Sequence, residues 1–214
     1  MDRRKALKTI GLGAGAITVT PAVVGLFQSC KSNTGQFIPE YFNQDQFSVV
    51  SQLMDLILPE TDIPGAIQLK LPEFLDGYIH TVYPDGRKKE IIKGLNQFIA
   101  VALSDSGKSK SSQLSVEDLD GQLAKFLKAE EGQVKSWKKQ TSDYNNASKN
   151  DSNAPIPQEA LAYGFASQLR SLSITAFRTN EYIGENVLAY APIPGEQKGC
   201  VDLMETTGGK IWSL

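Results

Sequence analysis

The sequence predicts a mostly α-helical protein, with a single helical domain, an irregular Gly/Pro-rich C-terminal segment and a preceding export signal. Apolar residues recur at helical spacing in successive segments that turn residues separate, and no run alternates between apolar and polar residues over the length of a strand. We assign the signal to residues 1–29, a tether to 30–44 and the helical domain to 45–214. The roughly 185 residues beyond the signal suffice for one sizeable core.

The first two helices are indicated by apolar spacing and by proline. An amphipathic helix is predicted over 45–58, with Asp45 as its N-cap and Pro59 as its stop. Its apolar residues are Phe47, Val50, Met54 and Ile57. A loop over 60–71 follows, and Pro72 occupies the first turn of a second helix. That helix carries Phe74, Leu75, Tyr78 and Ile79.

The middle of the chain contains a third helix and the start of a fourth. A turn at 83–86 precedes the third helix, which reaches about residue 103 and is followed by an exposed loop over 104–113. Its apolar residues are Ile91, Leu95, Phe98 and Ala102. Ser115 and Asp118 form a capping-box pattern that opens the fourth helix.

The fourth helix has Leu119, Leu123, Phe126 and Leu127 on one face. It continues past Gly132 to Trp137 if nothing breaks it. The polar, Asn-rich stretch 142–153 is expected to be loose, because it has little to bury. Pro157 starts a last helix, and the tail after Thr179 is expected to be irregular, with a short hairpin as one option. The apolar residues of the last helix are Leu161, Phe165, Leu169 and Leu172.

Composition excludes several function classes. The formal net charge is -2, and residues 1–29 carry four cations against one acid, so the rest of the chain is more acidic still. An acidic chain without a basic stripe is a poor nucleic-acid binder. One histidine and two cysteines give no cluster with metal-ligand spacing. The chain also lacks a Walker-type phosphate loop and a Cys-x-x-Cys-His haem motif.

The N-terminus resembles a twin-arginine export signal. Arg3 and Arg4 are adjacent, Leu7 and Lys8 follow, and an uncharged, mildly apolar stretch runs from residue 9 to 29. This pathway carries proteins that are already folded. An ordinary secretory signal that begins with two arginines is the alternative. Either signal predicts a periplasmic protein.

Cys30 has two interpretations. Residues 26–30 resemble a relaxed lipobox, in which Cys30 becomes a lipidated first residue that anchors the protein to a membrane surface. Alternatively, Cys30 pairs with Cys200 in a disulfide, which an oxidising compartment permits. We favour lipidation, which leaves Cys200 as a lone thiol expected to be buried.

Two segments together resemble the gluconate 2-dehydrogenase subunit 3 family. The first is Leu53-Met-Asp55-Leu-Ile57-Leu-Pro59-Glu60-Thr-Asp-Ile-Pro64-Gly65-Ala66, followed by Phe74-Leu-Asp76. The second is Phe177-Arg-Thr179-Asn-Glu181-Tyr-Ile-Gly184, followed by Leu188-Ala-Tyr190 and Pro194-Gly195. The likeness covers approximately residues 42–203.

The resemblance implies an accessory, non-catalytic role. The chain would be the small subunit of an exported sugar or sugar-acid dehydrogenase whose large subunit is a flavin enzyme of the glucose-methanol-choline type. FAD is expected in that large subunit, and no cofactor is expected in this chain. The small subunit would assist folding and assembly, and would take the large subunit through the twin-arginine translocase. Electrons would then pass to a cytochrome c subunit or another membrane acceptor.

Two groups of residues are candidates for contact with the partner. Pro59, Pro64, Gly65 and Ala66 form a loop that either docks on the large subunit or only links two helices in a tight turn. Tyr182 and Tyr190 are candidate interface anchors or, alternatively, close the helical core with their hydroxyls in water. Trp212, on a polar Gly-Gly-Lys tether, is a candidate for contact with a partner or a membrane surface.

Catalysis by this chain is not expected. We interpret His80 as a solvated or hydrogen-bonded helix residue. The carboxylates Asp55, Glu60, Asp62 and Glu73 are interpreted as a solvated loop face, because nothing in the sequence gives them opposed environments. The alternative function is a free-standing envelope lipoprotein that binds a glycan or a protein.

Overall fold

The computed structural model describes residues 37–191, 193, 195 and 199–213. The chain divides into two compact units, Met1–Phe37 and Ile38–Leu214, and the described helices all belong to the second. The α-helices are α3 (Gln44–Ile57), α4 (Leu71–Val82), α5 (Asp85–Ser106), α6 (Val116–Leu127), α7 (Glu131–Ala147), α8 (Gln158–Arg178) and α9 (Leu203–Thr207). A 3-10 turn, η2 (Ser111–Gln113), precedes α6, and a π-helical turn, η3 (Ile183–Val187), follows α8. The predicted mostly helical class is confirmed.

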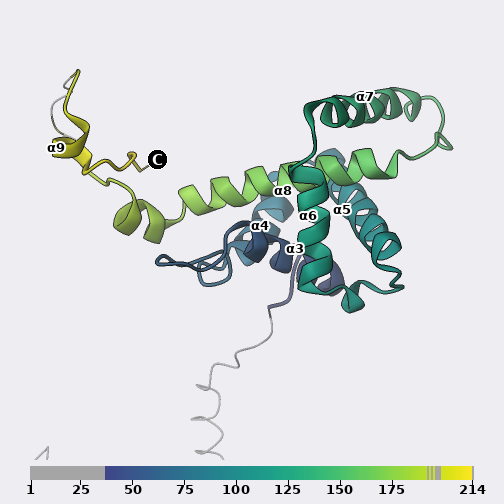
Figure 1. Cartoon of the computed structure of the whole chain (residues 1–214), viewed down its shortest axis with the longest axis horizontal. Helices are drawn as coiled ribbons and strands as arrows, with labels where there is room; N and C mark the ends of the chain where they lie inside the picture. The colour runs from purple at the N-terminus through teal and green to yellow at the C-terminus, as the bar shows by residue number, and fades with distance from the viewer. Residues whose placement is uncertain (1–36, 192, 194, 196–198, 214) are drawn as a thin grey trace, which may run out of the picture. The chain divides into compact units, whose positions relative to one another are not determined.

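Helix α8 is the axis of this unit. It packs against α3, α4, α5, α6 and α7, with α7 above it and α3 and α4 below it in Figure 1. Its buried residues are mostly small, namely Ala160, Ala162, Ala166, Ser173 and Ala176, with Phe165 and Leu169. Small side chains let neighbouring helices approach closely. On α5, a Cβ at Gly94 would lie only 3.0 Å from Phe165 Cβ, so glycine allows the two helices to cross at this distance without a shift of Phe165.

Aromatic rings join four helices in the core. Phe98 of α5 lies 5.8 Å from both Phe126 of α6 and Phe165 of α8, measured between ring centroids. Trp137 of α7 contacts Phe126 at 5.4 Å and stacks on Tyr163 of α8 at 5.1 Å. Aromatic pairs at these separations contribute beyond the area that they bury. The cluster therefore fixes α7, which is otherwise polar, against the rest of the unit.

The predicted caps of α3 and α6 can be compared with the structure. Ser115 caps α6 in a capping box with Asp118, as predicted. The N-cap of α3 is Asn43 rather than the predicted Asp45, because Asn43 accepts from Gln46 N while the Gln46 side chain accepts from Asn43 N. Asp45 lies in the first turn instead, where its negative charge suits the helix dipole.

Several predicted boundaries are wrong. Pro84 is the N-cap of α5, so the expected turn at 83–86 already contains the first helical residues, and the helix runs on to Ser106. The helix that begins at Val116 ends at Leu127 and does not continue to Trp137, which belongs to the separate helix α7. The stretch 142–153, expected to be loose, is helical as far as Ala147.

The C-terminal segment is irregular, as predicted, but its described residues form no hairpin. Ala189 and Trp212 pair in an isolated parallel bridge. Cys200, expected to be buried, is exposed. Cys30, the residue for which lipidation and a disulfide to Cys200 are the two predictions, lies outside the described residues. None of the helices described has both the length and the apolar character that crossing a membrane requires.

A buried carboxylate attaches the start of the folded unit to α4. Asp76 is fully buried, and its oxygens accept from three consecutive backbone N–H groups: Glu40 at 2.7 Å, Tyr41 at 3.2 Å and Phe42 at 2.9 Å. A buried charge is tolerated only when it is hydrogen-bonded in this way. Residues 40–42, which the sequence places in the tether, are therefore part of the fold.

We predict that Asp76→Ala lowers the free energy of unfolding by about 3 kcal/mol or more, because it leaves three amide groups without their acceptor. Urea denaturation followed by circular dichroism measures the change. Asp55→Ala, which removes an exposed carboxylate from α3, is the control and should change the value by only about 0.5 kcal/mol. A similar small loss in both variants would contradict the role assigned to Asp76.

A second prediction concerns alkaline pH. Tyr41 donates a hydrogen bond from its hydroxyl to the Lys88 carbonyl. Burial raises the pKa of Tyr41 to about 12. A backbone hydrogen bond at Ile92 lowers this pKa in part, and the negative charge of Asp76 raises it further. The folded protein therefore keeps a proton that the unfolded chain releases near pH 10, so stability falls as pH rises from about 10 to about 12.

Thermal unfolding across this range measures the effect. In Tyr41→Phe the decline should be shallower than in the unchanged protein, although the variant starts from a lower melting temperature because it lacks the hydrogen bond to Lys88. Equal slopes in the two proteins would show that Tyr41 does not retain its proton.

Candidate partner-binding surface

Helix α4 presents apolar side chains to solvent along one face. Phe74, Tyr78 and Val82 are spaced four residues apart and are 51%, 38% and 56% exposed. Residues at this spacing lie on the same side of a helix, so the three form a continuous line, the α4 stripe. The rings of Phe74 and Tyr78 stack with centroids 5.8 Å apart, and Tyr83 packs edge-on against Tyr78 at 5.6 Å. The aromatic groups therefore hold one another in a defined arrangement.

The core-facing side of α4, which adjoins the stripe, sets the direction of the stripe. Leu71, Leu75 and Ile79 are each 1% exposed and belong to the core. The helical pattern in the sequence combines Phe74 and Tyr78 with the buried Leu75 and Ile79, so the exposed stripe was not predicted. The spacing of Phe74, Tyr78 and Val82 was the available signal, since a helix with large apolar residues on two faces has more than its core face requires.

The predicted loop candidates divide by exposure. Pro59 is exposed and Pro64 is half-buried, whereas Gly65 and Ala66 are buried. Pro59 and Pro64 therefore have solvent-exposed surface that a partner could contact. The other two influence contact only through the shape of the loop that they stabilise.

Gly65 is required by a close approach of two backbone segments. A Cβ at this position would lie 2.5 Å from Glu60 N and 2.7 Å from Leu58 O. The adjacent Ala66 N–H donates to the same Leu58 carbonyl at 2.8 Å, and the Ala66 carbonyl accepts from Leu71 N at 2.9 Å. The Pro-Gly-Ala sequence thus joins the end of α3 to the start of α4 in a tight turn.

The three aromatic candidates of the C-terminal segment are all exposed. Tyr182 is 47% exposed, and Tyr190 and Trp212 are each 50% exposed. The parallel bridge brings the last two close in space: Ala189 N donates to Ile211 O at 2.9 Å, and Ser213 N donates to Ala189 O at 2.8 Å. Trp212 is therefore held by its backbone against Ala189, the residue before Tyr190, rather than carried on a free tether.

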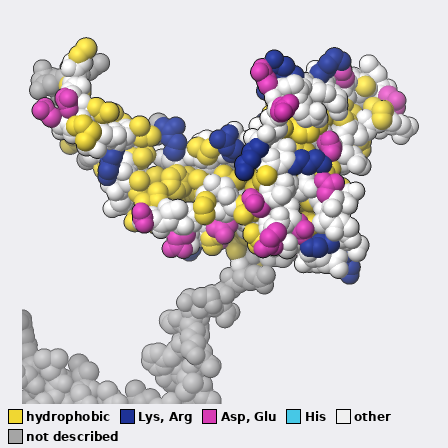
Figure 2. Space-filling view, viewed as in Figure 1, with side chains coloured by type: hydrophobic (Ala, Val, Ile, Leu, Met, Phe, Trp, Pro, Cys, Tyr) yellow, Lys and Arg dark blue, Asp and Glu magenta, His cyan; other side chains and the backbone are white. Residues whose placement is uncertain are grey.

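A hollow connects α4 with the C-terminal segment. This cavity of about 540 Å³ is bordered by Leu69 of the loop, Phe74 of α4, and Asn180 and Glu181 directly before Tyr182. In the view of Figure 2, hydrophobic side chains gather over the C-terminal end of α8 and the segment that follows it. We call the α4 stripe, Ile67, Tyr182, Tyr190 and Trp212 together the apolar surface. Exposed aromatic residues in such a group are typical of protein interfaces.

Two titratable groups with shifted pKa values, Asp105 and Lys125, lie in contacts between helices. Hydrogen bonds from Gln122 at 2.7 Å and from Lys125 at 2.9 Å lower the pKa of Asp105, and Lys125 also pairs with Glu159 at 2.8 Å. This network joins α5, α6 and α8.

His80 is exposed, with Nε2 4.0 Å from a Glu40 carboxylate oxygen. Among the described residues, no cluster of histidine, cysteine or acidic side chains could hold a metal ion.

The residues predicted to direct export and anchoring lie outside the described residues. These are Arg3, Arg4, Leu7, Lys8 and Cys30.

Comparison with known proteins identifies the family. The family model described as gluconate 2-dehydrogenase subunit 3 matches residues 44–195, which begin with α3 and include α4, α8 and Tyr190. No curated protein and no solved structure matches the chain. The match covers well over half of the chain and includes both segments on which the resemblance rests, so the protein belongs to the gluconate 2-dehydrogenase subunit 3 family.

Proposed function

We propose that this protein is the non-catalytic small subunit of an exported, FAD-dependent dehydrogenase of the glucose-methanol-choline type that acts on a sugar or sugar acid. Membership of a dehydrogenase subunit family gives the general role. The single structural observation that supports a binding role is the apolar surface, with its ordered α4 stripe. FAD and the redox chemistry belong to the large subunit in this proposal.

The α4 stripe has the physical properties of an interface anchor. Its aromatic rings are large, and stacking already restricts their rotamers, so little conformational entropy is lost when a partner covers them. Aromatic residues at the centre of an interface commonly carry most of the binding energy. The turn at Gly65 and the hydrogen bonds to Asp76 hold α4 in place, which makes the stripe a rigid docking element.

Export and location form the other part of the proposal. The twin-arginine signal would carry the folded complex through the translocase, so a large subunit without its own signal would reach the periplasm with this chain. A lipid on Cys30 would then keep the complex at the membrane, where a cytochrome c subunit could accept electrons. The small subunit would assist folding and assembly by covering apolar surface on its partner.

An affinity pull-down of the tagged, full-length chain from its native cell envelope tests this function. A co-purifying protein of flavin oxidoreductase sequence, with flavin absorption bands in the eluate, would support it. A colourless eluate that contains this chain alone, from cells that express the neighbouring genes, would overturn the stable complex. The free-standing binding module would then be the better hypothesis.

We predict that Phe74→Ser/Tyr78→Ser reduces the amount of co-purified flavoenzyme at least about tenfold, because two adjacent aromatic anchors are lost from the proposed interface. The matched control is Val116→Ser/Ile156→Ser, which removes exposed apolar side chains outside the apolar surface. Circular dichroism checks that both variants fold. Equal recovery of flavoenzyme with the two variants would exclude the α4 stripe as the docking site.

A separate prediction concerns Tyr182. Tyr182→Ala should lower the amount of flavoenzyme exported to the periplasm and leave the turnover per assembled flavin nearly unchanged, because a binding anchor affects assembly and not chemistry. Activity and flavin content of the periplasmic fraction measure both quantities. Normal assembly with reduced turnover would contradict an accessory role.

A further inference from the structure

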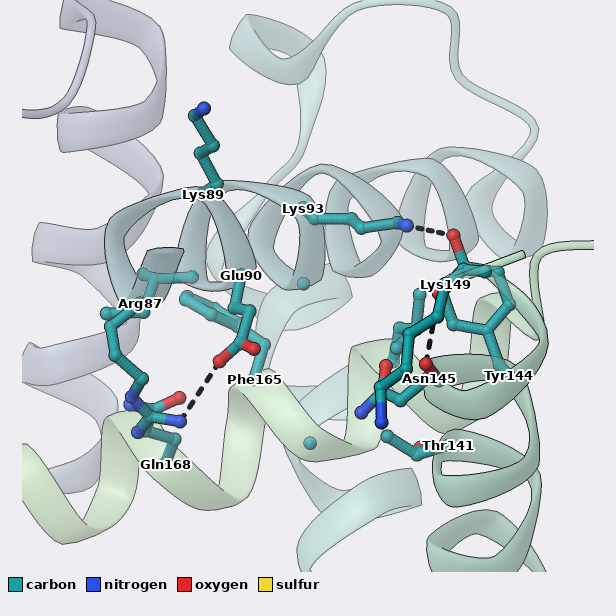
Figure 3. A pocket seen from close by; sticks show the side chains of 15 residues that line it. Arg87, Lys89, Glu90, Lys93, Thr141, Tyr144, Asn145, Lys149, Phe165 and Gln168 are labelled. Carbon is teal, nitrogen blue, oxygen red and sulfur yellow. Dashed lines mark hydrogen bonds and ion pairs between the residues drawn. The ribbon is translucent and has the colours of Figure 1, made fainter. Parts of the chain in front are cut away.

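A second hollow lies between α5, α7 and α8, outside the apolar surface. Figure 3 shows this pocket, which has a volume of about 530 Å³. Ile91, Leu161 and Phe165 contribute apolar side chains to its lining. The volume falls within the range of small-molecule sites, which are mostly apolar with a few convergent polar groups.

The pocket is basic, although the chain as a whole is acidic. Its lining contains Arg87, Lys89, Lys93 and Lys149 against the single carboxylate of Glu90. Only Arg87 is paired with that carboxylate, at 3.1 Å, within the part of the chain that the structure describes. Figure 3 shows Lys89 pointing away from the pocket, so the cationic groups that a ligand in the pocket could contact are those of Arg87, Lys93 and Lys149.

The two lysines near α7 have neutral partners. Lys93 is half-buried, donates to the Tyr144 hydroxyl and lies 4.2 Å from the centre of that ring. Lys149 donates to the Asn146 side chain at 3.3 Å. Neither ammonium group forms an ion pair with a described carboxylate. Their positive charges are therefore available to an anion, and a partly buried lysine interacts with one more strongly than a lysine in bulk water does.

Neutral polar groups lie between the charged ones. Thr141, Asn145 and Gln168 line the pocket, and no hydrogen bond of their side chains to another described residue is present. In Figure 3, Gln168 lies on the side of Arg87, and Thr141 and Asn145 lie on the side of Lys149. Side-chain hydroxyl and amide groups can both donate to and accept from the hydroxyl groups of a ligand.

Gly164 keeps one wall of the pocket open. It lies in the interior of α8, where glycine is less favourable than alanine, and a Cβ there would meet no atom within 4 Å. The same glycine borders an adjoining hollow of about 440 Å³, which adds Lys138 and Tyr163. Packing in the described structure does not require glycine at this position. A larger side chain here would narrow the pocket, so the glycine keeps the pocket accessible.

We propose that the α5–α7–α8 pocket binds a small organic anion, a carboxylate or phosphate that also carries hydroxyl groups. Lys93, Lys149 and Arg87 would neutralise the anion. Thr141, Asn145 and Gln168 would bind its hydroxyl groups, and the apolar lining would contact its carbon chain. This inference is independent of the proposed subunit role, because it uses none of the residues of the apolar surface.

Isothermal titration calorimetry of the full-length chain tests the ligand class. Gluconate is the first probe, sorbitol is its uncharged match with the same carbon chain, and inorganic phosphate carries charge without hydroxyl-bearing carbons. We expect saturable binding of gluconate that weakens as salt is added, at least tenfold weaker binding of sorbitol, and weak binding of phosphate. Absence of saturable binding by both anions, or equal binding of sorbitol and gluconate, would overturn the proposal.

Two variants locate the site. Lys93→Gln/Lys149→Gln should weaken gluconate binding by about tenfold for each charge removed. Gly164→Leu should abolish binding by filling the pocket, and it should not lower the melting temperature, because leucine favours the helix more than glycine does. Gly121→Leu, at a position in α6 where a Cβ also meets no atom, is the matched control. Unchanged affinity in Gly164→Leu would contradict the assignment.

A third experiment distinguishes two sources of the anion, a lipid headgroup and a free metabolite. Phosphatidylglycerol carries a phosphate with free hydroxyl groups, so a lipid headgroup has the same chemistry as a free metabolite. Flotation with vesicles that contain this lipid, compared between the unchanged chain and Gly164→Leu, separates the two sources. Flotation that depends on Gly164 and competes with gluconate would support a headgroup in the pocket. Gluconate binding without such flotation would support a free anion.

Discussion

The carboxylate of Asp76 determines how the first third of the folded unit is arranged. It binds the N–H groups of residues 40–42, which places Asn43 directly at the N-terminus of α3. It also fixes the rotation of α4, because the side that contains Asp76, Leu75 and Ile79 must face the interior. With that side buried, the side of the helix that contains Phe74 and Tyr78 faces solvent. The exposed stripe is thus a consequence of a buried charge on the other side of the same helix.

Helix α8 carries two distinct sites along its length. Its residues around Phe165 border the basic pocket, whereas Ala176 and the residues after it border the hollow beside α4. With a rise of about 1.5 Å per residue, these two positions are separated by more than about 15 Å along the axis. The close approach of α5 and α8 at Gly94 shapes the basic pocket, whereas the other hollow lies between α4 and the end of α8. The two hollows share no lining residue, so substitutions can be made in each of them separately.

The parts of the fold that the sequence could predict are those with local signals. Apolar spacing, Pro59 and the Ser115 capping box identified most helices, and the Pro-Gly-Ala pattern identified the turn at Gly65. Helix α7 was not predicted as a separate helix, because its helical state depends on Trp137, which packs against residues far away in the sequence. Likewise, exposure of the α4 stripe depends on which face Asp76 buries. The basic pocket combines three helices, so no single segment of sequence shows it.

The arrangement of the apolar surface argues for a lasting partner rather than a fleeting contact. The stacked rings on α4 restrict each other's rotamers, and the bridge fixes the backbone of Trp212 against that of Ala189, before any partner binds. Such restriction has no benefit for a chain that stays alone in water, where exposed apolar groups favour aggregation. It is useful when a partner covers the same groups in one geometry, because the entropy of ordering them is lost during folding and not during binding. A rigid scaffold with an apolar face therefore suits the subunit role that we propose, in which a larger protein covers that face.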